Sequence, residues 1–196
     1  DTVTSIGTSA FLGCTSLTQI ALPENLTTLD GNPFMYCFAL EEIEIPAGVS
    51  SIDQMAFYMC TSLRSVTLHE GLEIIGSQAF AACESLTEIT IPASVTSIGR
   101  YSFDSCTGLY QIVLPASITN IEEGAFSRCW RLKSIVIPEG VTKIEKDVFS
   151  GCSALTDITI PVSVTSIERY AFNGCTKLSD VYFGGTKAQW EQVAIG

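Results

Sequence analysis

Eight cysteines offer the first chemistry in this 196-residue chain, because thiols can form disulfides or bind zinc. Each has a phenylalanine three residues before it and a leucine three residues after it, a setting that favours a small buried side chain. Zinc needs clustered ligands, and disulfide pairing would distort alternate layers of a regular stack. We therefore predict buried free thiols and no metal site. Consecutive cysteines are always 23 residues apart: Cys14, Cys37, Cys60, Cys83, Cys106, Cys129, Cys152 and Cys175.

Acid–base chemistry has few candidate residues. His69 is the only histidine and stands where most repeats have proline, so we interpret it as a loop residue. Glu42 and Glu44 are two apart on a predicted strand, which places their Cα atoms about 7 Å apart on one face, a separation also found in inverting glycosidases. An open sheet face supplies no water-excluding pocket, which makes a carboxylate-based hydrolase a distant alternative. Asp157 and Asp180 are predicted to face each other, either sharing a cation weakly or repelling in solvent.

Composition excludes several classes of protein. The chain has 10 basic and 21 acidic residues, a net charge of −11, which argues against nucleic-acid or anionic-membrane partners. Apolar residues make up 46% of the chain, so disorder is not expected. The sequence as given shows neither a run long enough for a transmembrane helix nor a secretory leader.

The 23-residue spacing defines the elements that position these side chains. A segment such as 86–92 is apolar at alternate positions and ends at Pro92, which indicates a short strand. A repeat of this length leaves no room for a full crossover helix, so successive strands should stack into a parallel sheet. Eight strands would form a rod on the order of 40 Å long. The segment 76–83, around an Ala-Phe pair, predicts a tight turn or a single helical turn on the other side.

The full pattern is Leu-x-x-Ile-x-Ile-Pro, Val-x-x-Ile, Ala-Phe-x-x-Cys-x-x-Leu, over residues 3–183. It resembles the 23-residue leucine-rich repeats of BspA-like surface proteins, also described as the Treponema pallidum type. The resemblance implies a curved, right-handed, β-rich leucine-rich-repeat solenoid of about eight repeats, with a parallel sheet on its concave face and turns or single helical turns opposite. It also implies a bacterial secreted or cell-surface protein of the kind associated with adhesion. The family supplies no catalytic motif and no cofactor.

The two ends of the chain depart from the repeat. Residues 1–186 are predicted to form the solenoid, with a truncated first repeat, and residues 187–196 to form a capping segment. Thr186 and Gln189 match a capping box, which predicts a short helix over 187–194. Trp190 and Val193 would then cover the last core layer and protect the terminal strand.

Charge is unevenly divided along the predicted rod. Residues 1–99 contain 11 acids and one base, whereas residues 100–196 contain 10 acids and nine bases. A basic protein partner could therefore be steered to the first half. Ordinary solubility charge is the alternative interpretation.

Bulky side chains interrupt repeats two and three where other repeats mostly have Ser, Thr, Gly or Ala. The core positions are already occupied, so these residues should lie partly exposed on the turn side, as a candidate adhesive patch. Local repacking around Pro33 is the alternative explanation. The residues are Met35, Tyr36, Phe38, Met55, Tyr58 and Met59.

The outward strand positions form two columns, one polar and acidic and one mostly β-branched. Glu42, Glu44 and Glu88 are the acidic candidates for ligand contact. Such a face suits broad protein recognition, and it lacks the aromatic row expected for glycan binding.

These observations favour a non-enzymatic, extracellular or cell-surface interaction module of the adhesion type. Its expected partner is a host or bacterial surface protein, with a basic one suited to the acidic half. A passive stalk or spacer is the main alternative.

Overall fold

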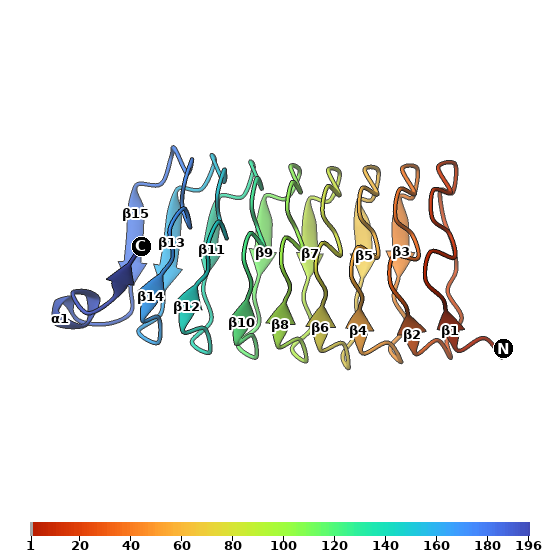
Figure 1. The fold of residues 1–196 in the computed structure, drawn as a ribbon, viewed down its shortest axis with the longest axis horizontal. Coiled ribbons are helices and arrows are strands. Elements are labelled where there is room, and N and C mark those ends of the chain that lie inside the picture. Colours follow the sequence, from red (N-terminus) through yellow and green to blue (C-terminus); the bar gives the residue numbers. More distant parts are fainter. Residues whose placement is uncertain (1) are drawn as a thin grey trace.

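The computed structural model describes residues 2–196 as an elongated solenoid in which each coil stacks directly on the one before (Figure 1). The strands form two parallel ladders that run along the stack, and each ladder consists of successive hydrogen-bonded groups of two to four strands. The first coil contributes a strand to the second ladder only. The first ladder consists of β3 (Glu42–Glu44), β5 (Ser65–Thr67), β7 (Glu88–Thr90), β9 (Gln111–Val113), β11 (Ser134–Val136), β13 (Asp157–Ile160) and β15 (Asp180–Phe183). The second consists of β1 (Ser5–Ile6), β2 (Thr28–Leu29), β4 (Ser51–Ile52), β6 (Ile74–Ile75), β8 (Ser97–Ile98), β10 (Asn120–Ile121), β12 (Lys143–Ile144), β14 (Ser166–Ile167) and β16 (Ala194–Ile195).

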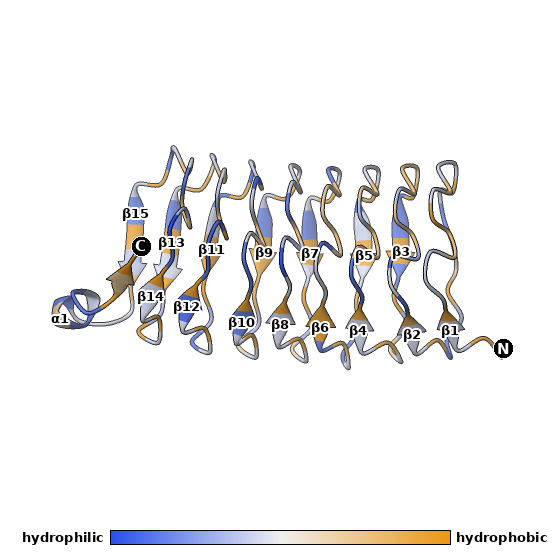
Figure 2. Ribbon diagram, in the orientation of Figure 1, coloured by the Kyte–Doolittle hydropathy of each residue, from blue (hydrophilic) through white to orange (hydrophobic). Residues whose placement is uncertain are grey.

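The register of the first ladder follows from the equal length of the repeats. Glu42 pairs with Ser65, Glu88 with Gln111, and Asp157 with Asp180. The middle residue of β3, β5, β7, β9 and β11 is buried and its two neighbours are exposed. In Figure 2, β3 accordingly has a hydrophobic middle between hydrophilic ends. The predicted solenoid, its parallel strands and the facing pair Asp157 and Asp180 are therefore confirmed.

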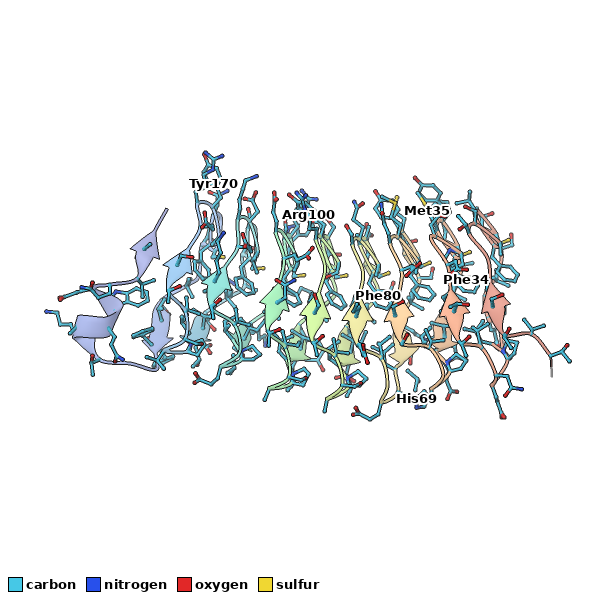
Figure 3. The ribbon with its side chains drawn as sticks, turned by 60° about the horizontal axis from the view of Figure 1, so that its bottom comes forward. Phe34, Met35, His69, Phe80, Arg100 and Tyr170 are labelled. Carbon is cyan, nitrogen blue, oxygen red and sulfur yellow. The ribbon has the colours of Figure 1, made fainter. Side chains whose placement is uncertain are left out.

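The second ladder was not predicted. The Val-x-x-Ile segment of each repeat contributes only two extended residues, as in Ser97–Ile98 of β8, which pair with their equivalents 23 residues on. The Ala-Phe segments form turns, and among the described residues the only helix is α1 (Lys187–Trp190). Turns with the Ala-Phe pairs lie along one side of the stack and turns at the prolines along the opposite side, marked in Figure 3 by Arg100 and His69. We call the first of these the turn side.

Phenylalanine rings form the centre of the core. Each ring stacks on the next from Phe11 to Phe172, with centroids 5.1–5.8 Å apart and planes within 12° of parallel. The six rings from Phe34 to Phe149 are fully buried. This continuous stack ties every coil to its neighbours through apolar contact and offset ring packing.

The cysteines line the core beside these rings. All eight are free thiols, and the six from Cys37 to Cys152 are buried, as predicted. The prediction is wrong for Cys14, which is exposed, and only partly right for Cys175, because within residues 2–196 no further coil covers the outer side of the first and last coils. The thiols also form hydrogen bonds between coils, which their interpretation as small apolar side chains did not include. Cys106 Sγ donates to the Phe80 carbonyl oxygen at 3.1 Å, and each cysteine from Cys37 to Cys175 makes the same bond to the preceding coil.

Two backbone positions in each coil have a left-handed conformation, as at Gln78 and Ala82. The residue before each cysteine has a positive φ, and glycine occupies this position in Gly13, Gly151 and Gly174 but not in Ala82, where φ is 57°. An L-residue there is strained because its Cβ crowds the adjacent carbonyl.

We expect Ala82→Gly to stabilise the protein by about 1 kcal/mol, because glycine removes this strain and little buried surface is lost. Urea unfolding followed by circular dichroism measures the change. The neighbouring Ala81→Gly is the matched control and should destabilise, since Ala81 is buried and has no positive φ. A lower unfolding midpoint for Ala82→Gly would contradict the strain argument.

The C-terminal cap is shorter than predicted. The capping box is confirmed, with the Thr186 backbone N–H donating to Gln189 Oε1 at 2.8 Å and Thr186 Oγ1 accepting from the Gln189 backbone N–H at 3.3 Å. The predicted helix over 187–194 is wrong beyond Trp190, because the chain returns to pair β16 with β14. Trp190 packs on Phe183 with centroids 5.2 Å apart, and Val193 also contacts the core.

The C-terminal capping segment does not fully cover the core of the last coil. Val181 occupies a core register position opposite Ile158, yet it remains 48% exposed. Within residues 2–196, none of the helical structure is long and apolar enough for a membrane span.

Candidate interaction surfaces

The bulky residues of repeats two and three form one cluster on the turn side, which we call the turn-side cluster. It comprises Met35, Tyr36, Phe38, Met55, Tyr58 and Met59. Tyr36 is at its centre, with its ring 5.9 Å from that of Phe38 and 5.8 Å, edge-on, from that of Tyr58. Figure 3 shows Met35 on the same side of the stack as Arg100 and Tyr170. The structure therefore brings these predicted residues together.

The turn-side cluster is less exposed than a free patch. Phe38 is 39% exposed, and the other five members are half-buried. The backbone around Pro33 also differs from other coils, because the left-handed residue is Gly31 rather than Asn32. A residue before proline is restricted in conformation, which accounts for this shift. Local repacking and a clustered aromatic surface thus occur together.

Glu42, Glu44 and Glu88 point outward from the open face of the first ladder, as predicted. Glu44 also pairs with His69, whose Nε2 lies 2.9 Å from Glu44 Oε1. This pair borders an open hollow of about 400 Å³ that Ile20, Leu22 and Glu24 also line. His69 therefore links two coils, which its interpretation as a loop residue did not include.

None of these acids forms a metal centre. Among residues 2–196, no three His, Cys, Asp or Glu side chains come together as a possible metal-binding group. Glu88 Oε2 instead accepts a hydrogen bond from the Tyr110 hydroxyl at 3.4 Å.

Ion pairs on the turn side use several bases of the second half. Glu123 joins three coils, with Arg100 Nη2 2.6 Å from its Oε2 and Lys146 Nζ 3.1 Å from its Oε1. The Tyr101 hydroxyl also donates to Glu123 Oε1, at 3.0 Å. The bond to Lys146 lowers the pKa of Glu123, and the same bond raises the pKa of Lys146. Burial raises the pKa of Tyr101, and its bond to Glu123 adds to this effect. These bases therefore stabilise the coils and are not free for a partner.

The open face of the second half carries exposed apolar side chains that were not selected from the sequence as contact residues. They are Tyr110 (39% exposed), Val113 (67%), Val136 (63%) and Tyr182 (57%). The sequence does indicate this surface, because Val113 and Val136 occupy an outward-facing column in which the neighbouring coils have Thr90 and Thr159. The methionines were the more conspicuous departure from the repeat, yet they are the more buried group.

Two parallel ladders on a 23-residue coil, with a leucine in every core layer, define a leucine-rich repeat solenoid. The chain belongs to the BspA-type leucine-rich repeat family, because the model of the family described as "BspA type Leucine rich repeat region" matches residues 1–110 and 73–194 in six copies. The recognised resemblance is thus confirmed. A comparison with curated proteins found no significant match.

Solved structures of bacterial leucine-rich repeat proteins share this fold. The T. pallidum leucine-rich repeat protein is 31% identical with a TM-score of 0.71, over 90% of this chain and 72% of that one. A leucine-rich repeat protein from Bacteroides ovatus is 28% identical with a TM-score of 0.66, over 92% of this chain and 64% of that one. The pneumococcal vaccine antigen PcpA has the same fold at 23% identity and a TM-score of 0.63, over 92% of this chain and 56% of that one. The chain therefore spans less than two thirds of the last two proteins.

Proposed function

We propose that this chain is a non-enzymatic, adhesion-type protein-interaction module of a bacterial extracellular or cell-surface protein. The turn-side cluster carries the proposal, because bulky side chains are concentrated in two coils of an otherwise regular stack. Aromatic residues and methionine are enriched in protein interfaces, where they supply large contact areas. The extracellular or surface location rests on the resemblance to BspA-like surface proteins.

The acidic half of the solenoid favours a basic protein partner. Glu42 and Glu88 are exposed on the open face, and residues 1–99 contain a single base. Opposite charge accelerates association and excludes acidic competitors. The partner is therefore proposed to be a host or bacterial surface protein with a basic contact region.

A stalk is the second candidate function, and the unbroken phenylalanine stack favours it. A spacer needs only regular coils, whereas a binder needs an accessible surface that differs from coil to coil. The two functions therefore differ in whether changes confined to the turn-side cluster have any effect.

Capture of immobilised matrix proteins and bacterial surface proteins by the purified chain tests the proposal. We expect the double variant Tyr36→Ala, Tyr58→Ala to lose at least about 90% of capture, since central aromatic residues dominate interface energies. Tyr170→Ala is the matched control, because Tyr170 is a 56% exposed aromatic residue on the turn side outside the cluster. Unchanged capture by the double variant would reject the cluster, and absence of capture by the native chain would favour the stalk. Hydrolytic turnover that is lost in Glu44→Gln would instead indicate the hydrolase.

A further inference from the structure

The open face between β9 and β11 combines aliphatic surface with depth. Val113 and Val136 are 67% and 63% exposed and occupy equivalent positions, at the ends of these two strands. They border a groove of about 520 Å³ that Tyr110, Gln111 and Lys133 also line. A second groove, of about 290 Å³, adjoins it across β9. Exposed valines in a concave setting are a place where an apolar side chain of a partner gains contact.

The other end of this groove carries the positive charge of Lys133, which no ion pair among the described residues neutralises. Within residues 2–196, Arg131 and Lys133 form no ion pair, whereas Arg100, Arg128 and Lys146 all do. Lys133 immediately precedes β11 and Val136 ends it, so about 10 Å of strand separates the cation from the aliphatic end.

We propose that the β9–β11 groove binds an extended acidic segment of a partner protein, with an aliphatic side chain on Val113 and Val136 and a carboxylate at Lys133. Such a segment of about three to four residues spans the distance between the cation and the valines. The inference rests on the proposed protein-binding function and names a second surface for it, with a charge preference opposite to that of the acidic half.

Peptide is favoured over glycan by the chemistry of the groove. Its apolar floor is aliphatic, whereas sugar rings prefer to pack on aromatic faces. The hydroxyl of Tyr110, the aromatic residue of the groove, is bonded to Glu88. The carboxylate of Glu88 also disfavours a densely anionic polymer by repulsion. A peptide segment with one acidic residue needs only the Lys133 end of the groove.

Selection of a random peptide library displayed on phage against the intact chain tests this proposal. We expect enriched peptides to carry Asp or Glu within four residues of Val, Leu, Ile or Phe. A synthetic copy of an enriched peptide should bind at least about tenfold more weakly to Val113→Thr, Val136→Thr, and likewise to Lys133→Thr. These changes preserve the fold, because neighbouring coils already have Thr90, Thr159 and Thr156 at the same positions. Lys177→Ala is the matched control. Lys177 lies outside the groove and forms no ion pair within residues 2–196, so its removal should leave binding of the peptide unchanged.

Three results would overturn the proposal: no enrichment, enriched peptides that the valine variant retains, or displacement of the peptide by polygalacturonate, which would indicate a glycan site. The test is independent of the turn-side cluster, because Tyr36→Ala, Tyr58→Ala should bind the peptide as the native chain does. Peptide binding without capture of surface proteins would reject the proposed function at that cluster and keep the groove, and the reverse result would reject the groove alone.

Discussion

We expect the solenoid to lose most of its stability between pH 9 and 11. Burial raises the pKa of the Cys37 and Cys175 thiols from 9.0 to about 11 and raises the pKa of the five thiols between them further. Below pH 9 these thiols are protonated in both states and contribute nothing to the pH dependence. Above pH 9 the unfolded chain releases protons that the folded chain retains, so stability falls as pH rises.

The expected loss is large because the thiols act together. Each interior thiol contributes on the order of 1 kcal/mol per pH unit above 9, so the five together contribute on the order of 5 kcal/mol per unit. That is comparable with the whole free energy of unfolding of an ordinary domain. Urea unfolding at pH 8, 9 and 10 under reducing conditions measures it.

A cysteine variant separates this effect from other titrating groups. The pKa values of Lys143 and Lys146 are raised by bonds to carboxylates, so these lysines also favour the folded state at lower pH. Cys106→Ala, Cys129→Ala removes two thiols and leaves those lysines in place. It should be less stable at pH 8, because two bonds to phenylalanine carbonyls are lost, but should lose less stability between pH 8 and 10. A native chain equally stable at pH 8 and 10 would contradict the argument.

Phe103→Ala is expected to cost about 3–5 kcal/mol and to break the cooperativity of the chain. Phe103 is fully buried, and its ring lies 5.5 Å from Phe80 and 5.6 Å from Phe126. Alanine leaves a cavity between two rings that no other side chain fills. Because each coil contacts only its neighbours, a central defect uncouples the two halves.

Two optical probes detect that uncoupling. Both tryptophans, Trp130 and Trp190, lie in the second half, so their fluorescence reports that half, whereas circular dichroism reports both halves. The two probes should give one urea midpoint for the native chain and different midpoints for Phe103→Ala. Phe172→Ala, in the half-buried last coil, is the control and should cost less without separating the probes. Coincident midpoints together with a loss below 1 kcal/mol in Phe103→Ala would disprove the continuous stack.

The repeat length, the first ladder and the buried interior thiols could be predicted from sequence because each depends on a pattern repeated eight times. The second ladder could not, since two residues such as Ser97–Ile98 are too few to show a strand periodicity. The end of α1 at Trp190 could not be predicted from the sequence either, because pairing of β16 with β14 overrides the weak local preference for helix.

The candidate surfaces were predictable in composition but not in exposure. The gathering of Tyr36 and Tyr58 follows from the repeat, whereas their partial burial depends on how neighbouring rings pack. The exposure of Val136 likewise depends on tertiary packing, which leaves the outer face of β11 open to solvent. The thiol donors to phenylalanine carbonyls are invisible in sequence, because they depend on the offset between one coil and the next.

The constant offset between paired residues also limits how genes of this kind can change in length. Duplication or excision of one complete 23-residue unit adds or removes a coil and leaves every ring above another ring. A deletion of one codon moves all later positions in that unit out of alignment with the layer beneath. Unequal recombination between units in register is therefore the mutational route that preserves the fold, and closely related strains should differ by whole coils.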